Sequence, residues 1–272
     1  MNEQQKPRKM KTEMKKMMLM SLVALVAMTM TSCMHVKIGG KNWLMGNHTN
    51  DTPTQVHQVG QETAMNPFDV VNVVGPFNVI YQQGNSNTVR VEGTTEQLGK
   101  ITIYVEDGEL TIDQRRNESG DVFNGMQIFV TSPTIQNIDI AGSGTVTAPQ
   151  TLKADDLKLE IAGSGGITLA QLTCKKLTND IAGSGSVTLG MVQADEVSND
   201  IAGSGDIDIA ALTCKKVKND IAGSGDIILS NLNVDHIDSD IAGSGDVTLR
   251  GNVGSHSEDI AGSGKVKLNE EK

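Results

Sequence analysis

The pentapeptide Ile-Ala-Gly-Ser-Gly occurs seven times in the second half of the chain, at a spacing of about 20 residues. The copies begin at Ile140, Ile161, Ile181, Ile201, Ile221, Ile241 and Ile260. A unit that recurs at a fixed period of this length is typical of solenoid proteins, in which a repeat buries its apolar residues only against its neighbours. A unit copied this often also resembles a scaffold, and nothing in it resembles a unique active site.

Apolar residues fall at fixed offsets within each unit. The unit that begins at Ile181 continues with Val187, Leu189, Val192, Ala194 and Val197, and the next unit repeats this as Ile201, Ile207, Ile209, Leu212, Cys214 and Val217. The alternation breaks at each Gly-Ser-Gly, where glycine allows positive φ or close backbone approach, and this predicts short strands joined by corners. We therefore predict an all-β fold, a right-handed parallel β-helix with about 20 residues per coil.

The chain before the repeats has a different β pattern. Residues 67–135 contain short runs with period-two spacing, such as Phe77, Val79 and Tyr81, and predict irregular N-terminal strands ahead of repeat coils over 136–268. Asp107-Gly108 between strand-like residues predicts a tight hairpin. No segment after Met30 shows a helical period. We expect residues 67–272 to form a single β-helix domain.

The first 32 residues have the layout of a lipoprotein signal peptide. A basic start is followed by an apolar run from Met17 to Met30, which is shorter than the roughly 20 residues of a membrane-spanning helix. Thr31-Ser32-Cys33 then resembles a lipobox, in which the cysteine is acylated and becomes the mature N-terminus. An ordinary signal peptide with an incidental cysteine is the alternative.

Acylated Cys33 is therefore the one functional residue that the sequence predicts. Two or three acyl chains would hold the protein on a membrane through lipid contacts. Residues 33–66 are polar and rich in Gly, Asn, Thr and Gln, so we expect this lipidated N-terminus to be a flexible tether. No acidic cluster follows Cys33, which favours the outer membrane with the body facing the periplasm over surface exposure.

Charge and cysteine content limit the partners. Residues 33–272 keep 17 Lys and Arg against 31 Asp and Glu, a net charge near −14, which argues against nucleic acid as a partner. Cys174 and Cys214 stand at equivalent places in two units that are separated by a third. If coils stack about 4.8 Å apart, these cysteines lie about 9.6 Å apart, too far for a disulfide. We predict two buried free thiols.

An acidic residue precedes the leading Ile of every unit. Stacked coils would bring these residues into one column, comprising Asp139, Glu160, Asp180, Asp200, Asp220, Asp240 and Asp259. We expect the carboxylates to accept hydrogen bonds from corner serines and turn amides. A calcium ladder that also uses Asp206, Asp226 and Asp246 is the alternative, because Ca²⁺ favours oxygen ligands.

No catalytic, cofactor-binding or metal-binding residues are predicted. The serine of Gly-Ser-Gly has no base at a fixed partner position, and no nucleotide-binding glycine fingerprint is present. All seven aromatic residues precede residue 130, so the repeats offer no ring on which a sugar could stack. A carbohydrate-active β-helix enzyme remains the competing class, since an acid-rich chain could supply paired carboxylates.

Tandem Ile-Ala-Gly-Ser-Gly units that follow the strand Gly75-Pro-Phe-Asn-Val-Ile-Tyr81, behind a lipobox, resemble the putative auto-transporter adhesin, head GIN domain family of Bacteroidetes-type envelope proteins. The resemblance covers roughly residues 67–268. It implies a right-handed parallel β-helix and suggests an adhesin. The sequence thus favours a non-enzymatic, lipid-anchored envelope protein that binds a glycan or an envelope protein, with a structural spacer as a further alternative.

Overall fold

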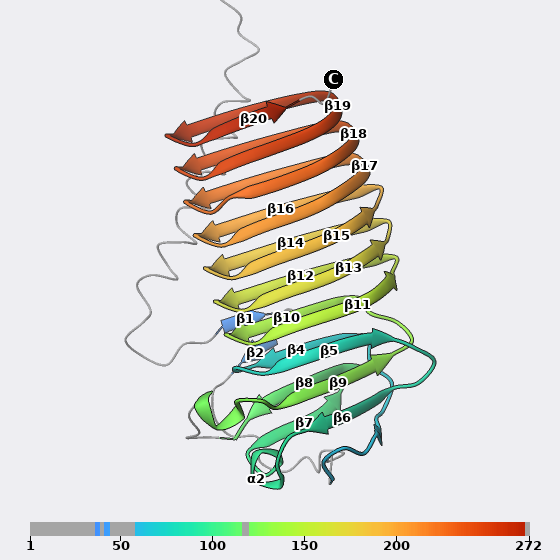
Figure 1. Cartoon of the computed structure of the whole chain (residues 1–272). Coiled ribbons are helices and arrows are strands. Elements are labelled where there is room, and N and C mark those ends of the chain that lie inside the picture. The colour runs from blue at the N-terminus through green and yellow to red at the C-terminus, as the bar shows by residue number, and fades with distance from the viewer. Residues whose placement is uncertain (1–35, 39–40, 44–57, 116–119, 270–272) are drawn as a thin grey trace, which may run out of the picture. The chain divides into compact units, whose positions relative to one another are not determined.

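A computed structural model describes residues 36–38, 41–43, 58–115 and 120–269 (Figure 1). The chain divides into two compact units, residues 1–51 and 52–272. In the first unit, β1 (Val36–Ile38) pairs antiparallel with β2 (Lys41–Trp43). The second unit contains every other described element, and the following paragraphs concern this unit.

The repeats form a β-solenoid of about seven turns, as the sequence predicts. Its strands stack in parallel along the coil axis (Figure 1). They are β10 (Asn137–Gly142), β11 (Thr145–Lys153), β12 (Asp156–Gly163), β13 (Gly166–Thr173), β14 (Lys176–Gly183), β15 (Ser186–Gln193), β16 (Glu196–Gly203), β17 (Asp206–Gly223), β18 (Ile227–Gly243), β19 (Asp246–Gly262) and β20 (Lys265–Asn269). The long strands β17, β18 and β19 each run along both sides of a coil.

The register of the coils follows the repeat. Ile181 lies beside Ile161 on one neighbouring coil and beside Ile201 on the other. The same alignment continues from Ile140 to Ile260, which confirms the predicted period. All strand pairs between β10 and β20 are parallel, and the handedness of the coil remains an expectation from the crossover rule.

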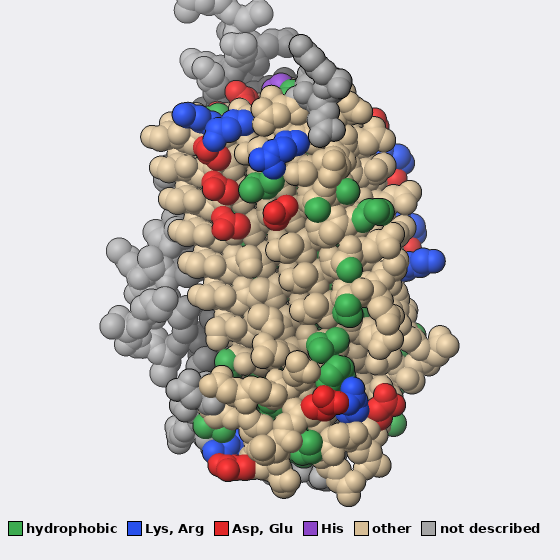
Figure 2. Space-filling model, viewed as in Figure 1, with side chains coloured by type: hydrophobic (Ala, Val, Ile, Leu, Met, Phe, Trp, Pro, Cys, Tyr) green, Lys and Arg blue, Asp and Glu red, His purple; other side chains and the backbone are tan. Residues whose placement is uncertain are grey.

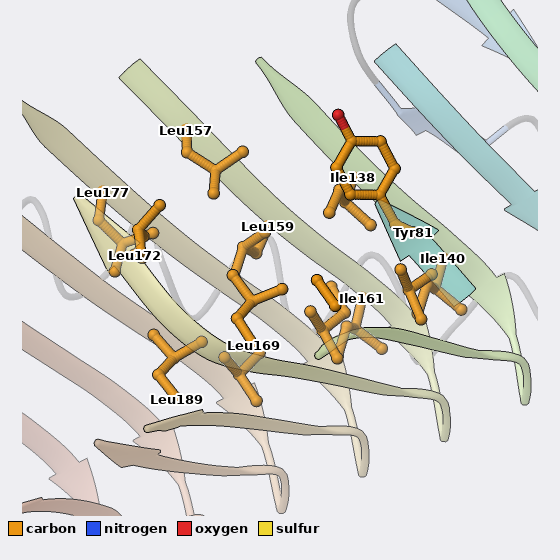
Figure 3. Close-up of a cluster of buried hydrophobic side chains, with 14 of the residues drawn as sticks. Tyr81, Ile138, Ile140, Leu157, Leu159, Ile161, Leu169, Leu172, Leu177 and Leu189 are labelled. Carbon is orange, nitrogen blue, oxygen red and sulfur yellow. The ribbon is translucent and has the colours of Figure 1, made fainter. Parts of the chain in front are cut away.

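Rows of aliphatic side chains fill the interior between the two sides of each coil (Figure 3). Leu157, Leu159 and Ile161 point inward from one strand, and their exposed fractions are 1%, 0% and 2%. Alternate residues of a strand face opposite sides, so every second residue enters this core. Each such side chain contributes roughly 1.5 to 3 kcal/mol when it is removed from water.

Glycine is required where each Ile-Ala-Gly-Ser-Gly turns the corner. Gly203 has a φ of 136°, a backbone conformation that residues with a Cβ rarely adopt. A Cβ at this position would also collide with the carbonyl oxygen of Gly183 on the preceding coil. The two constraints together explain why the corner sequence is copied so closely.

Antiparallel strands close the N-terminal end of the solenoid. β4 (Val70–Val74) and β5 (Asn78–Gln83) continue the parallel stack onto β8 (Glu109–Gln114) and β9 (Gln127–Ser132). Outside these, β7 (Ile101–Glu106) pairs antiparallel with β8, and β6 (Thr88–Glu92) with β9. The structure confirms the hairpin at Asp107-Gly108, where φ is 49° and 82°.

Two features of this end differ from the sequence expectation. A one-turn helix, α2 (Thr95–Leu98), follows Thr94, whose side chain and that of Gln97 form a capping box. A strand, β3 (Thr63–Ala64), pairs with β6, and Met65 is buried. The folded body therefore begins before the expected boundary at residue 67, because Met65 contributes to its core.

A short 3-10 turn, η2 (Gly120–Phe123), precedes β9.

A row of buried polar side chains runs through the core beside the aliphatic rows. The Asn179 Nδ2 donates to the Asn199 Oδ1 at 2.7 Å, and the Asn199 Nδ2 donates to the Asn219 Oδ1 at 2.8 Å. The Asn219 Nδ2 then donates to the Ser239 hydroxyl at 3.1 Å. All four residues are at most 1% exposed. The sequence analysis missed this asparagine ladder, which gives buried amides partners on neighbouring coils but leaves the Asn179 Oδ1 at its start without a partner among the described residues.

Cys174 and Cys214 are buried and free, as predicted. Burial raises the pKa of the Cys174 thiol to about 12 and that of the Cys214 thiol to about 11. Cys214 Sγ also donates to the carbonyl oxygens of Asp195 and Lys216, at 3.2 and 3.0 Å. Both thiols act as small core residues at a corner of the coil.

Candidate binding face

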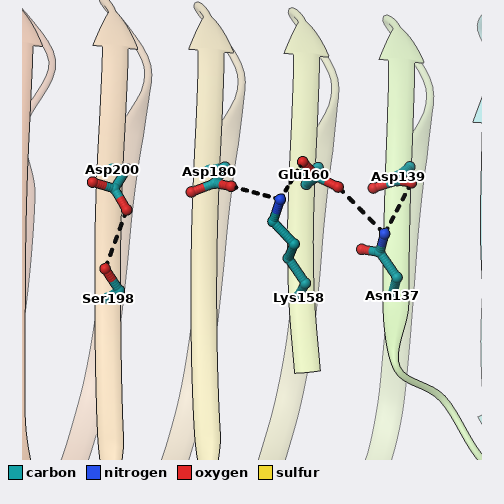
Figure 4. Close-up of polar contacts among 7 residues, drawn as sticks. All are labelled: Asn137, Asp139, Lys158, Glu160, Asp180, Ser198 and Asp200. Carbon is teal, nitrogen blue, oxygen red and sulfur yellow. Dashed lines mark hydrogen bonds and ion pairs between the residues drawn. The ribbon is translucent and has the colours of Figure 1, made fainter. Parts of the chain in front are cut away.

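The acidic residues that precede each leading Ile lie in register on one side of the solenoid. Asp180, for example, is beside Glu160 and Asp200 on the two neighbouring coils (Figure 4). We call the full set the acidic column, which comprises Asp139, Glu160, Asp180, Asp200, Asp220, Asp240 and Asp259. The sequence prediction of one stacked column is confirmed.

The acidic column takes hydrogen bonds from residues two positions earlier on the same side of the strand (Figure 4). Lys158 Nζ contacts Glu160 Oε1 at 2.5 Å and Asp180 Oδ2 at 3.0 Å. The Ser198 hydroxyl donates to Asp200 Oδ2 at 3.1 Å. Lys218 pairs in the same way with Asp220. These partners differ from the corner serines that we expected, because residues i and i−2 of a strand share a face.

The N-terminal end of the acidic column brings two carboxyl groups around one amide. Asn137 Nδ2 donates to Asp139 Oδ2 at 3.0 Å and to Glu160 Oε2 at 3.3 Å. Burial, and then the neighbouring Glu160 carboxylate, raise the pKa of Asp139 to about 8. Burial also tends to raise the pKa of Glu160. Hydrogen bonds from Asp139 and Lys158 outweigh this effect and hold the pKa of Glu160 below its usual value. Asp139 therefore holds its proton more tightly than an isolated aspartate does.

A second charged column lies on this side, four residues earlier along the same strands, and has a different composition. It runs through Asp156, Lys176, Glu196, Lys216 and His236, so opposite charges alternate along the stack. The acidic column has one sign throughout, and like charges about 4.8 Å apart repel by about 1 kcal/mol per pair even in water. Only Lys158 and Lys218 place a positive charge two residues before it on the same strands. The acidic column is therefore a row of like-charged side chains, in which Lys158 and Lys218 pair with Glu160, Asp180 and Asp220.

A column of alanines flanks the acidic column on the corner side. Ala162, Ala182 and Ala202 lie in register, and most of this column is partly or fully exposed. Alanine is the smallest side chain with a Cβ, so this strip leaves the carboxylates open to a partner from that direction. A repeated negative row with an unobstructed flank can bind a partner by charge and hydrogen bonding.

The second acidic row has a structural role. The backbone N–H of Asp226 donates to Asp206 Oδ1 at 3.0 Å, and that of Asp246 donates to Asp226 Oδ1 at 2.8 Å. The backbone N–H of Lys265 continues the series by donating to Asp246 Oδ1 at 2.9 Å.

On the face that Figure 2 shows, charged side chains gather toward the two ends of the coil stack, and the coils between them carry few charges.

In the described part of the chain, no group of three or more His, Cys, Asp or Glu side chains is placed to hold a metal ion. Five carboxylates of the acidic column and three of the second row have the protein partners given above, namely Asp139, Glu160, Asp180, Asp200, Asp220, Asp206, Asp226 and Asp246. These observations give no support to the calcium ladder that the acidic rows suggested.

Cys33 and the leader, residues 1–32, lie outside the described residues, so the expected acylation site stays a prediction. Among the helices of the described residues, none has the length and apolar character needed to span a bilayer.

The geometry defines a class: a parallel β-solenoid with a closed N-terminal end and a repetitive acidic face. The family model for the "putative auto-transporter adhesin, head GIN domain" matches residues 67–230 and 218–270. The chain belongs to this family, which confirms the resemblance of its repeats. Comparison with curated proteins gives no match.

Solved structures from two genera share the fold. A "putative adhesin" from Bacteroides fragilis is 25% identical with a TM-score of 0.68, and the alignment covers 76% of this chain and 95% of that one. A "putative lipid binding protein" from Parabacteroides distasonis is 24% identical with a TM-score of 0.65, over 78% and 96% of the two chains. A "putative adhesin" from Parabacteroides merdae is 17% identical, with a TM-score of 0.56 over 76% and 94%.

Proposed function

We propose that this protein is a non-enzymatic adhesin or binding scaffold of the cell envelope, anchored to a membrane by acylated Cys33. Family membership and the similarity to the "putative adhesin" from Bacteroides fragilis support the adhesin class. The lipobox Thr31-Ser32-Cys33 supports the anchor. We propose the outer membrane, with the body facing the periplasm, as its location.

The acidic column is the observation that supports binding as the activity. Repulsion between like charges in the acidic column lowers stability, whereas opposite charges alternate in the column four residues earlier, from Asp156 to Lys216. Most of the acidic column is partly exposed, and a partly exposed arrangement that lowers stability is typical of a functional surface. The expected partner is a glycan or an envelope protein that carries positive charge or hydrogen-bond donors.

Binding is tested by neutralising the acidic column. The variant Asp180→Asn, Asp200→Asn, Asp220→Asn removes three charges from it, and a matched control, Asp155→Asn, Asp195→Asn, Glu196→Gln, removes three charges from other columns. Both are compared with the unmodified chain on a glycan array and against envelope extracts. We expect at least tenfold weaker binding for the first variant alone. Equal loss in both variants would contradict a specific role for the acidic column.

The same preparation is tested for enzymatic turnover on a panel of polysaccharides. Release of products would contradict the non-enzymatic assignment and favour a carbohydrate-active enzyme. Retention of a ligand without turnover supports a binding scaffold. No retention and no turnover would favour a structural spacer in the envelope.

The anchor is tested separately by labelling cells with a radioactive fatty acid. We expect label on the unmodified chain and none on Cys33→Ala. Equal labelling of the two would contradict acylation at Cys33. Protease added to intact cells should spare a body that faces the periplasm, and its removal would place the body on the cell surface.

A further inference from the structure

The two ends of the solenoid are built differently. At the N-terminal end, the antiparallel strands β6 and β7 lie outside the parallel stack. At the other end, no described strand covers β20 and the last part of β19 (Figure 1). We call residues 251–269 the terminal coil. Its Ile260 and Leu268 are half-buried, whereas Ile241 and Leu249, their partners one coil earlier, are buried.

Three inward columns change chemistry at the terminal coil. One of them runs through Leu152, Leu172, Val192, Leu212 and Leu232 and ends at Gly251. A second runs through Leu157, Leu177, Val197, Val217 and Ile237 and ends at His256. The third is the asparagine ladder, which ends at Glu258 beside Ser239. The positions that build the core elsewhere therefore carry a glycine, a histidine and an acid here. The side chains of His256 and Glu258 are exposed.

The outward columns change at the same coil. Lys265 follows Asp246, and Lys267 follows Thr248, and both lysines are exposed on β20. The earlier members of the Lys267 column are Thr147, Thr168, Thr188, Asp208 and Ile228, so lysine appears only where the stack stops. Lys267 Nζ reaches Asp246 Oδ2 at 2.6 Å, which ties this strand to the coil below.

We propose that the terminal coil prevents a second copy of this chain from stacking on the open end. A strand with unpaired N–H and C=O groups is a template for edge-to-edge pairing, and inward charges and edge lysines are the features that block it. Stacking would bury Glu258 and His256 of both copies in the joined core, which is costly for ionised groups without partners.

At the N-terminal end the outermost described strands, β3 and β7, run antiparallel to their partners and do not repeat the parallel register of the coils, so two open ends are the matching surfaces for such stacking. A pair is therefore the expected product when the block is removed. The block keeps the body a single copy, so neighbouring copies in the envelope do not join end to end.

The test restores the repeat sequence at the open end. In the variant His256→Ile, Glu258→Ser, Lys267→Thr, each position takes the residue found one coil earlier in its column. A matched control, His236→Ile, Glu196→Ser, Lys176→Thr, makes the same substitutions in one outward column of the central coils. The molar mass of the full chain is measured in detergent by light scattering during size-exclusion chromatography.

We expect the mass of one chain for the unmodified protein and the control, and a twofold larger mass for the restored variant. Adding Leu268→Lys to the restored variant should return the single-chain mass, which would locate the contact at this end. Two outcomes would overturn the proposal. One is a restored variant that has the unmodified circular dichroism spectrum and stays a single chain. The other is an unmodified protein that already pairs through this end.

Discussion

At the residue scale, two kinds of position cannot change freely: the corner glycines and the inward side chains. Gly203 combines a positive φ with close contact to the preceding coil. The sequence predicted this corner because Gly-Ser-Gly recurs at every turn. It did not predict which groups would contact the acidic column, because the bridging lysines and serine are not part of the repeated motif.

Replacing Gly203 with Ala should lower the free energy of unfolding by about 2 to 4 kcal/mol, through backbone strain and a clash with Gly183. Urea unfolding monitored by circular dichroism measures this change. Ser204→Ala at the exposed neighbouring position is the control and should change the free energy by less than about 0.5 kcal/mol. An equal effect of both substitutions would contradict the special role of this glycine.

The buried thiols should be unreactive in the folded state. The pKa values of Cys174 and Cys214 are raised to about 12 and 11, so both stay protonated at pH 8, and both side chains are buried. A thiol reagent such as dithionitrobenzoate should therefore detect the thiols of Cys174 and Cys214 only after denaturant is added. The raised values also mean that stability falls above about pH 9, where the unfolded thiols ionise and the folded ones do not. Reaction of either thiol in the native protein would contradict its burial.

At the element scale, strands and hairpins were predictable where local chemistry decides them. Asp107-Gly108 adopts positive φ at both residues, which is the geometry its sequence favours. The helix α2 was missed because four residues are too few to show a helical period, although the Thr94 and Gln97 capping box was present as a signal. The asparagine ladder was missed because the inward rows were expected to be aliphatic, although the predicted stacking aligns Asn179, Asn199 and Asn219.

Replacing Asn199 with Ala should destabilise the body by about 2 to 5 kcal/mol. The substitution leaves the Asn179 Nδ2 and the Asn219 Oδ1 buried without their ladder partner, and each such loss costs about 1 to 3 kcal/mol. Thermal unfolding measures the change. Ser198→Ala, on the outward side of the same strand, is the control. A melting temperature unchanged by Asn199→Ala would contradict a structural role for the ladder.

At the scale of the whole molecule, stability comes from contacts between neighbouring coils. The predicted register was confirmed because the repeat fixes both the apolar rows and the corners. The chemistry of the open end was not predicted. His256 and Glu258 are identified as inward positions only by their pairing with Ile237 and Ser239.

A charge placed in the middle of the core should therefore act over several coils. Ile201→Asp puts a carboxylate at a position that is 3% exposed, between Ile181 and Ile221. Because coils contact only their neighbours, we expect faster amide hydrogen exchange in β16, β17 and β18 than in β4 and β5. Asp200→Ile on the outward side of the same strand is the control. A uniform change across all strands would contradict nearest-neighbour stability.

Coil-on-coil register has a consequence for how such a chain can change in length. Because every interior junction presents the same corner and the same apolar rows, an in-frame duplication of one 20-residue unit inserts a turn that fits both its flanks. Each insertion extends the rod by about 4.8 Å and adds one carboxylate to its row, while both termini of the rod keep their own sequences. Duplication of a repeat in the gene can therefore increase the length of the solenoid and the number of carboxylates in the acidic column together. No contact between coils has to change.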